Sequence, residues 1–336
     1  MRRALRVGSV AQAARNGKAR VAGSARVTNS ERAAGAARVA DSAAPAALDR
    51  MRREFERHFA AALPPATLSP SRLHAALRYS ALSPGKRMRP LLVLAACEAV
   101  GGKWTRALPA AVAVECVHAF SLVHDDLPAM DDDDYRRGRL TTHKKFGEAL
   151  GVLAGDALLA LAFEQLAALA EHDVPALRVV QAVQVLARAA GSRELVGGQV
   201  LDLEAERRTV TGARVRDIHR RKTGALVAAS LVLGGIAGGA QASELRTLEV
   251  CGHELGLAFQ IHDDLLTRSS SLARLGKRTG TDDARGKATY PRAVGEERAR
   301  LDAARLFRAA VGRVTGFGPR AHTLAGLMLS VAERER

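Results

Sequence analysis

The stretch that decides the fold is Leu108–Asp134, LPAAVAVECVHAFSLVHDDLPAMDDDD, in which a long apolar run ends in a dense acidic cluster. Six of the ten residues from Asp125 to Asp134 are aspartates. At the end of a helix these carboxylates repel one another and oppose the negative end of the helix dipole. A solvated acidic loop is one interpretation of such a run. The core-like helix before it favours another, in which buried carboxylates hold Mg²⁺ through oxygen ligands.

A second acidic cluster, Gln260–Thr267 (QIHDDLLT), ends another long apolar stretch. Paired aspartates on two helices would clamp metal ions against a diphosphate from both sides. In a helix Asp263 and position 267 share one face. Asp125 and Asp131 are six residues apart, so the first helix must unwind or kink near Pro128 for both to reach one ion.

The rest of the chain predicts an all-α fold. Helix formers dominate, only 4% of the residues are aromatic, and no stretch alternates with period two. We expect a single large helical bundle around a central active-site cavity, with no linker between separate domains. The expected helices are Met51–Leu63, Leu73–Ala81, Leu91–Val100, Leu108–Leu127, Phe146–Leu169, Pro175–Ala190, Glu194–Arg207, Arg214–Gly234, Leu245–Thr267, Glu296–Val311 and Ala321–Glu333.

The N-terminal segment differs in composition from the rest. It supplies +7 of the net charge of +16, because residues 1–50 hold ten Lys and Arg against Glu31, Asp41 and Asp49. We expect residues 1–45 to be a disordered or targeting-like extension and 46–336 to be the functional domain. No apolar signal-peptide core is present, so a cytoplasmic location is expected, with an organellar one if residues 1–45 are a transit peptide. No basic patch is interleaved with aromatics, and we therefore expect no nucleic-acid partner.

Two further features exclude other classes of protein. Cys97, Cys116 and Cys251 lie in apolar stretches without CxxC spacing, which predicts buried free thiols. The longest uncharged run, Thr223–Ser243, contains several glycines and polar residues. It is predicted to be a buried core helix, and stable membrane insertion is not expected.

Further motifs resemble the trans-prenyltransferase (polyprenyl synthetase) family, most closely its bacterial-type farnesyl diphosphate synthases. They include Gly85–Pro90, Glu115–Gly147, Leu153–Ala157, Gly198–Leu203, His219–Ala225, Phe259–Asp264 and Gly276–Pro291. The resemblance implies a helical bundle around a deep cavity, usually as a homodimer. It also implies diphosphate substrates and Mg²⁺, about three ions per active site when substrate is bound.

The resemblance assigns roles by position. Asp125, Asp131 and Asp263 would bind Mg²⁺, supported by Asp126. Arg136, Lys222, Lys277 and Lys287 would hold the allylic diphosphate, while Thr223 and Gln260 would face the developing carbocation. Lys86, Arg89, His118 and Arg137 would form the pocket for isopentenyl diphosphate. Together these imply ionisation of dimethylallyl or geranyl diphosphate, condensation with isopentenyl diphosphate and loss of a proton.

Phe120 bears on product length. It lies five residues before Asp125, about one helical turn deeper, where a ring would form the floor of the cavity after a short chain. An ordinary core aromatic is the alternative for this residue taken alone. In the family context Phe120 favours a farnesyl (C15) product over a geranylgeranyl or longer one. A terpene cyclase is disfavoured, because Lys86, Arg89 and His118 would hold a second diphosphate.

One position departs from the family pattern. The second motif ends in an acid in the family, and here that position is Thr267. A hydroxyl cannot act as a charged acceptor for metal-bound water. We expect weakened Mg²⁺ or allylic binding, and a weakly active or non-catalytic partner subunit is the alternative.

Overall fold

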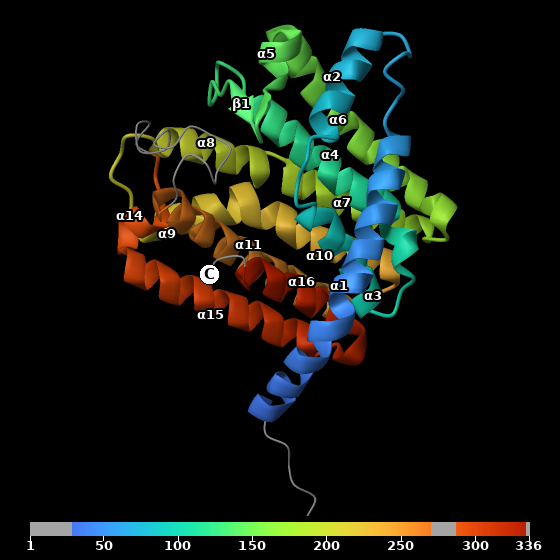
Figure 1. Ribbon diagram of the computed structural model, residues 1–336, viewed down its shortest axis with the longest axis vertical. Helices are drawn as coiled ribbons and strands as arrows, with labels where there is room; N and C mark the ends of the chain where they lie inside the picture. Colours follow the sequence, from blue (N-terminus) through green and yellow to red (C-terminus); the bar gives the residue numbers. More distant parts are fainter. Residues whose placement is uncertain (1–28, 270–286, 334–336) are drawn as a thin grey trace, which may run out of the picture.

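The computed structural model describes residues 29–269 and 287–333, with side chains for 44–266 and 287–330. Within these ranges the chain is almost entirely helical, which confirms the all-α prediction (Figure 1). The only strands there are the two-residue pair β1 (Tyr135–Arg136) and β2 (Arg139–Leu140), antiparallel. The helices are α1 (Asn29–Ala62), α2 (Ser71–Ala81), α3 (Met88–Ala99), α4 (Leu108–Asp125), α5 (Thr142–Phe146), α6 (Glu148–Ala167), α7 (Ala176–Ala190), α8 (Leu195–Ala205), α9 (Gly212–His219), α10 (Ala225–Gly238), α11 (Ala242–Ser269), α14 (Tyr290–Val294), α15 (Glu296–Thr315) and α16 (His322–Glu333).

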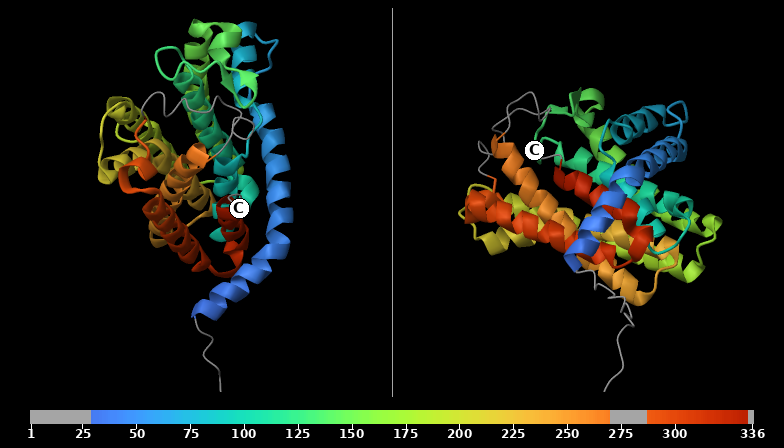
Figure 2. Two further views of the ribbon diagram at one scale, coloured as in Figure 1. Left: turned by 60° about the vertical axis from the view of Figure 1, so that its left-hand side comes forward. Right: turned by 60° about the horizontal axis from the view of Figure 1, so that its bottom comes forward.

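The core is built on α4 and α10. Helix α4 packs on α3 and α6, and α10 packs on α3, α7 and α11, with α15 outside α11. Almost every residue of α10 is buried, as its uncharged sequence predicts. A side chain at Gly234 would collide with the backbone of Val93, so this glycine lets α10 approach α3 closely. The long helix α1 runs along the edge of the bundle against α16 and α4 (Figure 2).

Several helix boundaries differ from the expected ones by a few residues; α4, for example, ends at Asp125 rather than Leu127. Two expected helices differ more. Helix α1 spans Asn29–Ala62 and so includes residues before the expected Met51, and Ala44 and Leu48 on this added part are buried. The expected helix Arg214–Gly234 is divided by a π-helical turn, η3 (Arg220–Gly224), between α9 and α10. Such turns widen a helix locally and are frequent at functional sites. The division at residues 45 and 46 stays a prediction.

Two described helical stretches are long and apolar enough to span a membrane. In Trp104–Asp125, 78% of the apolar window is buried in the protein, as in the core helix of a soluble protein. In Glu148–His172 only 39% is buried, so this helix leaves much apolar surface on the outside.

The predicted buried thiols are confirmed, and burial raises the pKa of Cys97 and Cys251 to about 12.

Candidate active site

The first acidic cluster begins where α4 ends. Helix α4 stops at Asp125, and the chain then turns back so that the backbone N–H of Asp131 donates to the carbonyl of Asp125 over 2.8 Å. The predicted unwinding near Pro128 is therefore confirmed, and it brings Asp125 and Asp131 together. Burial, reinforced by the charge of Asp131, raises the pKa of Asp125, whereas Lys222, Arg136 and Lys287 act against this rise. A carboxylate in this position is stabilised by any further cation.

Asp126 turns away from Asp125 into the protein. Its side chain is only 4% exposed, and its two oxygens accept from Nε of Arg136 at 2.7 and 2.9 Å. Burial would lower the pKa of Arg136, but the hydrogen bonds to Asp126 and the negative charge of Asp126 raise it. Asp126 thus fixes the β-hairpin that carries Arg136 to the end of α4.

The second acidic cluster lies on α11 and divides in the same way. Asp263 is exposed, whereas Asp264 is 7% exposed. Asp264 accepts from the backbone N–H of Tyr290 at 2.8 Å and from Nε2 of Gln260 at 3.2 Å, and Nε2 of His219 lies 3.4 Å away. Gln260 in turn accepts from the hydroxyl of Thr223 at 2.8 Å. The polar groups of α9, η3, α11 and α14 therefore form one network.

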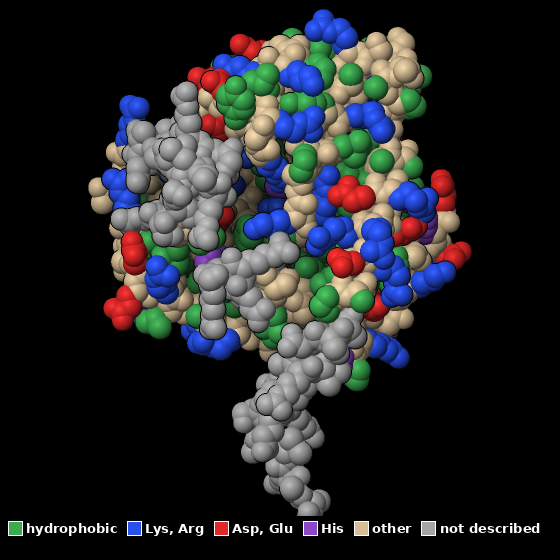
Figure 3. All heavy atoms as spheres, viewed as in Figure 1, with side chains coloured by type: hydrophobic (Ala, Val, Ile, Leu, Met, Phe, Trp, Pro, Cys, Tyr) green, Lys and Arg blue, Asp and Glu red, His purple; other side chains and the backbone are tan. Residues whose placement is uncertain are grey.

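Two lysines lie beside the first cluster. Nζ of Lys287, just before α14, lies 3.3 Å from Asp131. Lys222 on η3 pairs with Asp202 of α8 at 2.7 Å, and both lysines oppose the rise in the pKa of Asp125 that burial causes. Residues from α4, α8, η3 and the segment before α14 thus converge on one region. In the space-filling view, Lys and Arg side chains gather around the hollow in the middle of the face shown (Figure 3).

A basic pocket adjoins the first cluster on the side of α2 and the hairpin. Its described lining residues are Tyr79, Ser80, Ala81, Ser83, Arg87, Glu115, His118, Ala119, Leu122, Val123, Asp126, Arg136, Arg137, Leu140, Thr141 and Thr142. Burial, together with the charges of four neighbouring arginines, holds the pKa of His118 well below its usual range. His118 is therefore neutral, and the positive charge here belongs to the arginines.

These arginines are only partly neutralised. Arg87 pairs with Glu115 at 2.7 Å, and Arg136 is held by Asp126. Arg89 contacts Nε2 of His118 at 3.4 Å, and Arg137 donates to the carbonyl of Pro84 at 2.9 Å. Nε of Arg89 is buried and has no hydrogen-bond partner among the described residues. Arg137 lines the pocket, whereas Arg89 reaches it only through its contact with His118. Neither guanidinium directly contacts a carboxylate among the described residues, and this positive charge suits an anion.

Comparison with known proteins agrees with this chemistry. The polyprenyl synthetase family model matches residues 70–315. The chain belongs to the polyprenyl synthetase family. A chloroplastic heterodimeric geranylgeranyl pyrophosphate synthase large subunit 1 of Arabidopsis thaliana is 48% identical over 252 residues, which are 74% of this chain and 68% of the relative. Geranylgeranyl pyrophosphate synthase 7, chloroplastic, of the same plant is 45% identical over 79% of this chain and 77% of its own.

Solved structures of the family share the fold. An FPP/GFPP synthase from Zymomonas mobilis superposes with a TM-score of 0.75 at 36% identity, over 85% of this chain and 97% of the other. A geranyltransferase from Helicobacter pylori, complexed with magnesium and isoprenyl diphosphate, gives a TM-score of 0.73 at 30% identity, over 85% and 96%. The chain is therefore a prenyltransferase of isoprenoid biosynthesis with the all-α fold of this family.

The remaining family positions lie as follows. Lys86 is exposed in the loop before α3. Phe120 is buried in α4, 7% exposed, with its ring edge-on to His124 at 4.9 Å, and it is not among the residues that line the basic pocket. Lys277 lies outside the described residues, as does the side chain of Thr267, whose backbone belongs to α11.

The carboxylates do not form a ready-made metal cage. Within residues 29–269 and 287–333 no group of three or more His, Cys, Asp or Glu side chains is placed to hold a metal ion. Mg²⁺ is commonly bound by one or two carboxylates together with substrate phosphates and water. The pair Asp125 and Asp131 therefore fits Mg²⁺ that arrives with a diphosphate.

Several residues at the site were not assigned from the sequence. They are Arg87, Glu115, Asp202, His219, Asp264 and Tyr290. All lie within or beside motifs that resemble the family, but only the fold shows their partners. Asp202 follows Gly198 by one helical turn on α8, and a side chain at Gly198 would collide with the backbone of Lys222. This glycine and aspartate together bring α8 against the π-helical turn.

Proposed function

We propose that this prenyltransferase condenses isopentenyl diphosphate with dimethylallyl and geranyl diphosphate to give farnesyl diphosphate. The observation that supports this proposal best is the presence of two separate cationic regions on either side of the first cluster. Lys222 and Lys287 lie near Asp125, whereas Arg137 lines the pocket and Arg89 contacts His118 at its wall. Two regions suit two diphosphates, which a condensing enzyme must hold at once.

We propose that Asp125, Asp131 and Asp263 hold Mg²⁺ with the allylic diphosphate, with about three ions bound in the full complex. When bound, Mg²⁺ neutralises charge on the diphosphate and stabilises pyrophosphate as a leaving group. The raised pKa of Asp125 supports this assignment, because burial leaves that carboxylate in need of a cation. The solved relative that carries magnesium supports the same cofactor.

The chain's own residues would act by position and charge. Lys222, Lys287 and Arg136 would hold the allylic diphosphate and the charge that develops on it as the C–O bond breaks. The hydroxyl of Thr223 and the amide of Gln260, already bonded to each other, would place oxygen atoms towards the allylic cation. Lys86, Arg89, His118 and Arg137 would orient isopentenyl diphosphate, whose C=C bond attacks the cation. No side-chain nucleophile is required.

Product length is the finer part of the proposal. A buried Phe120 one turn above Asp125 supports a C15 product, since a ring there shortens the space for the growing chain. The names of the relatives favour a second candidate, because the Arabidopsis proteins are geranylgeranyl synthases and the Zymomonas mobilis structure is named an FPP/GFPP synthase. A C20 product is therefore the competing function.

The experiment is an incubation of pure protein with labelled isopentenyl diphosphate, each allylic diphosphate and Mg²⁺, with products separated by chain length. Farnesyl diphosphate is expected from the wild type. Phe120→Ala should lengthen the product by one or more C5 units. Phe317→Ala is the matched control, since Phe317 is a partly buried core aromatic between α15 and α16. Absence of any condensation would overturn the proposal, and an unchanged product from Phe120→Ala would remove Phe120 from it.

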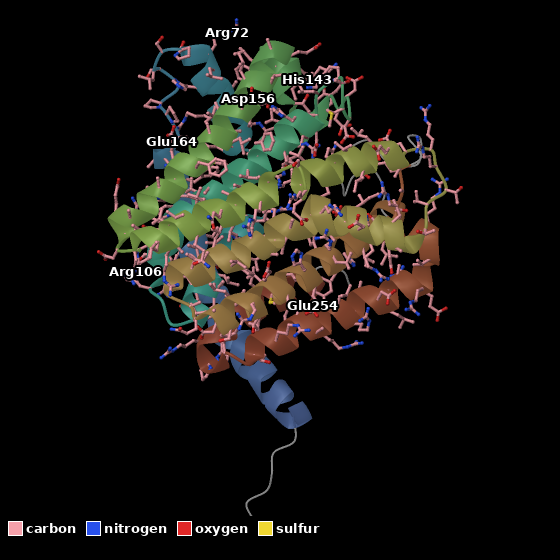
Figure 4. All side chains as sticks on the ribbon, turned by 180° about the vertical axis from the view of Figure 1, so that it is seen from behind. Arg72, Arg106, His143, Asp156, Glu164 and Glu254 are labelled. Atoms are coloured by element: carbon pink, nitrogen blue, oxygen red, sulfur yellow. The ribbon has the colours of Figure 1, made fainter. Side chains whose placement is uncertain are left out.

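We also propose that the enzyme is a homodimer that pairs through α6, α7 and α8. Of the twelve exposed large apolar side chains in the described residues, seven lie on these neighbouring helices: Val152, Leu153, Leu177, Val180, Val196, Val200 and Leu203. Asp156 and Glu164 mark α6 in the rear view (Figure 4). Leu153→Asp should shift the protein to a monomer in size-exclusion chromatography with light scattering. A monomeric wild type would contradict the homodimer.

We propose that the protein is cytoplasmic. Residues 1–45 would decide the location, because an organellar location would require them to be a transit peptide. Several relatives are named chloroplastic, which supports a transit peptide as the alternative. Fusing residues 1–45 to a fluorescent reporter tests the two. An organellar signal would overturn the cytoplasmic assignment.

A further inference from the structure

Arg87 lies between Lys86 and Arg89, two residues proposed to bind isopentenyl diphosphate, but it is more buried than either. It is the residue before α3, its φ is +50°, and it is only 5% exposed. A left-handed backbone costs a residue with a side chain roughly 1 kcal/mol or more. Contacts made by the Arg87 side chain must therefore hold the loop in this conformation.

The guanidinium of Arg87 joins three parts of the fold. Its Nε donates to Glu56 of α1 at 2.8 Å, and its Nη1 donates to Glu115 of α4 at 2.7 Å. Its Cζ lies 5.5 Å from the centre of the Phe59 ring, also on α1. The side chains of Arg87 and Glu115 are 4% and 5% exposed. Breaking a buried ion pair on one side leaves an uncompensated charge and is strongly destabilising.

The same loop is held from its other side by Arg137. Its Nη1 donates to the carbonyl of Pro84, and a Cβ added at Gly85 would lie 2.6 Å from that nitrogen. Glu115 and His118 are three residues apart on α4, so they are neighbours on its surface. The Arg87–Glu115 pair therefore fastens the loop to the turn of α4 that presents His118 to Arg89.

The pairing also determines which charges remain for a ligand. Burial lowers the pKa of both Arg89 and Arg137, and the nearby charge of Glu115 opposes this effect. Its direct contact, however, is with Arg87. By binding Glu115, Arg87 keeps that carboxylate from pairing with Arg89 or Arg137, which leaves those two arginines able to bind an anion.

We propose that Arg87 is a positioning residue for the diphosphate of isopentenyl diphosphate. Arg87 lines the pocket, but its guanidinium is bound by Glu56 and Glu115, so it acts through the loop and not as a direct ligand of the substrate. Through Glu56 and Glu115 it sets the loop that carries Lys86 and Arg89, and it keeps Glu115 from neutralising the pocket. This inference rests on the proposed function, because it concerns one of the two substrates of that reaction.

The test is the steady-state kinetics of Arg87→Gln with each substrate varied separately. We expect the KM for isopentenyl diphosphate to rise at least about tenfold, with the KM for geranyl diphosphate and kcat changed less than about threefold. Arg87→Lys keeps the charge but bonds only one carboxylate, and it should restore part of the affinity. Arg57→Gln is the control, since Arg57 lies on the exposed face of the same helix as Glu56.

A merely structural role predicts a different result. If Arg87→Gln lowers kcat alone, or raises both KM values equally, the inference is overturned. Should Arg87→Gln fail to fold, Glu56→Gln removes only the outer partner, whose side chain is 41% exposed, and should still raise the KM for isopentenyl diphosphate about threefold. A Glu56→Gln enzyme with both KM values unchanged would overturn it too. A wild type that forms no product is instead a failure of the proposed function.

Discussion

The two acidic clusters are built alike but anchored differently. In each, the leading aspartate, Asp125 or Asp263, is the more accessible one, and the next, Asp126 or Asp264, is buried and bound to other parts of the chain. Asp126 accepts from a guanidinium, that of Arg136. Asp264 accepts from neutral donors, among them the backbone N–H of Tyr290. A paired aspartate motif therefore combines a carboxylate for the ligand with a carboxylate for the fold.

Loss of the two buried aspartates, Asp126 and Asp264, should lower the stability of the protein by different amounts. Without Asp126 the positive charge of Arg136 stays buried next to the first cluster. Among the described residues, the partners of Asp264 that lose an acceptor are neutral donors, which is the cheaper loss. The first cluster also has a second carboxylate at the site, Asp131, in contact with Lys287. The corresponding position of the second cluster, 267, is a threonine.

The largest effect is expected at the leading aspartates. Asp125→Asn should lower kcat/KM about 10³-fold, and Asp263→Asn about 10²-fold, because removal of one group that stabilises developing charge has effects of this size. Asp125 should cost more since it lies beside Asp131, Lys222 and Lys287. Steady-state kinetics over a range of Mg²⁺ concentrations measures both. Equal losses would show that the clusters contribute alike.

The anchoring aspartates should affect stability more than chemistry. Asp126→Asn should lower the free energy of unfolding by about 3 kcal/mol, because it breaks a buried pair on one side. Asp264→Asn should lower it by about 1 kcal/mol, since an amide oxygen still accepts the N–H of Tyr290. Urea unfolding followed by circular dichroism measures the difference. A larger loss from Asp264→Asn would reverse the proposed order of the anchors.

The sequence was sufficient for the helices and the leading acids, but not for the anchors. Helical periodicity and the run of aspartates predicted α4, though two residues too long, and the approach of Asp131 to Asp125, because these depend on residues close together along the chain. The roles of Asp126 and Asp264 depend on where their side chains point. Their partners, Arg136 and Tyr290, are 10 and 26 residues away along the chain.

The π-helical turn was missed for a related reason. The stretch Arg214–Gly234 has continuous helical spacing, so the periodicity predicts one regular helix. The turn at Lys222 depends on the close approach of α8 at Gly198 and on the pairing of Lys222 with Asp202. Neither contact is visible before the fold brings these helices together.

A change at position 267 should make the second cluster resemble the first. Position 267 follows Asp263 by four residues within α11, and i and i+4 lie on one face of a helix. Thr267→Asp should raise kcat/KM about fivefold and lower the Mg²⁺ concentration for half-maximal rate, since a carboxylate can accept from metal-bound water. Thr267→Asn is the uncharged control. An unchanged Mg²⁺ dependence in Thr267→Asp would show that the threonine does not weaken this site.

The smallest effect on stability is expected at His219, whose protonation state decides whether Asp264 has a neutral or a charged partner there. Burial, opposed by the charge of Asp202 and reinforced by that of Lys222, lowers the pKa of His219 from 6.5 to about 4. The folded protein thus keeps this ring neutral where the unfolded chain binds a proton. The stabilisation is fully present above pH 6.5 and is lost as the pH falls from 6.5 through 4.

His219→Gln should therefore flatten the acid side of the stability profile. At pH 5.5 the wild type should have lost about 1 kcal/mol through this histidine relative to pH 7.5, and the variant should lack that loss. Thermal unfolding at both pH values measures it, with His322→Gln as the control for a histidine far from the clusters. If the variant instead steepens the acid loss, His219 is protonated beside Asp264 in the folded protein. Asp264 would then form an ion pair with His219, as Asp126 does with Arg136. The clusters would then differ only in their carboxylates for the ligand, since the first has Asp131 where the second has Thr267.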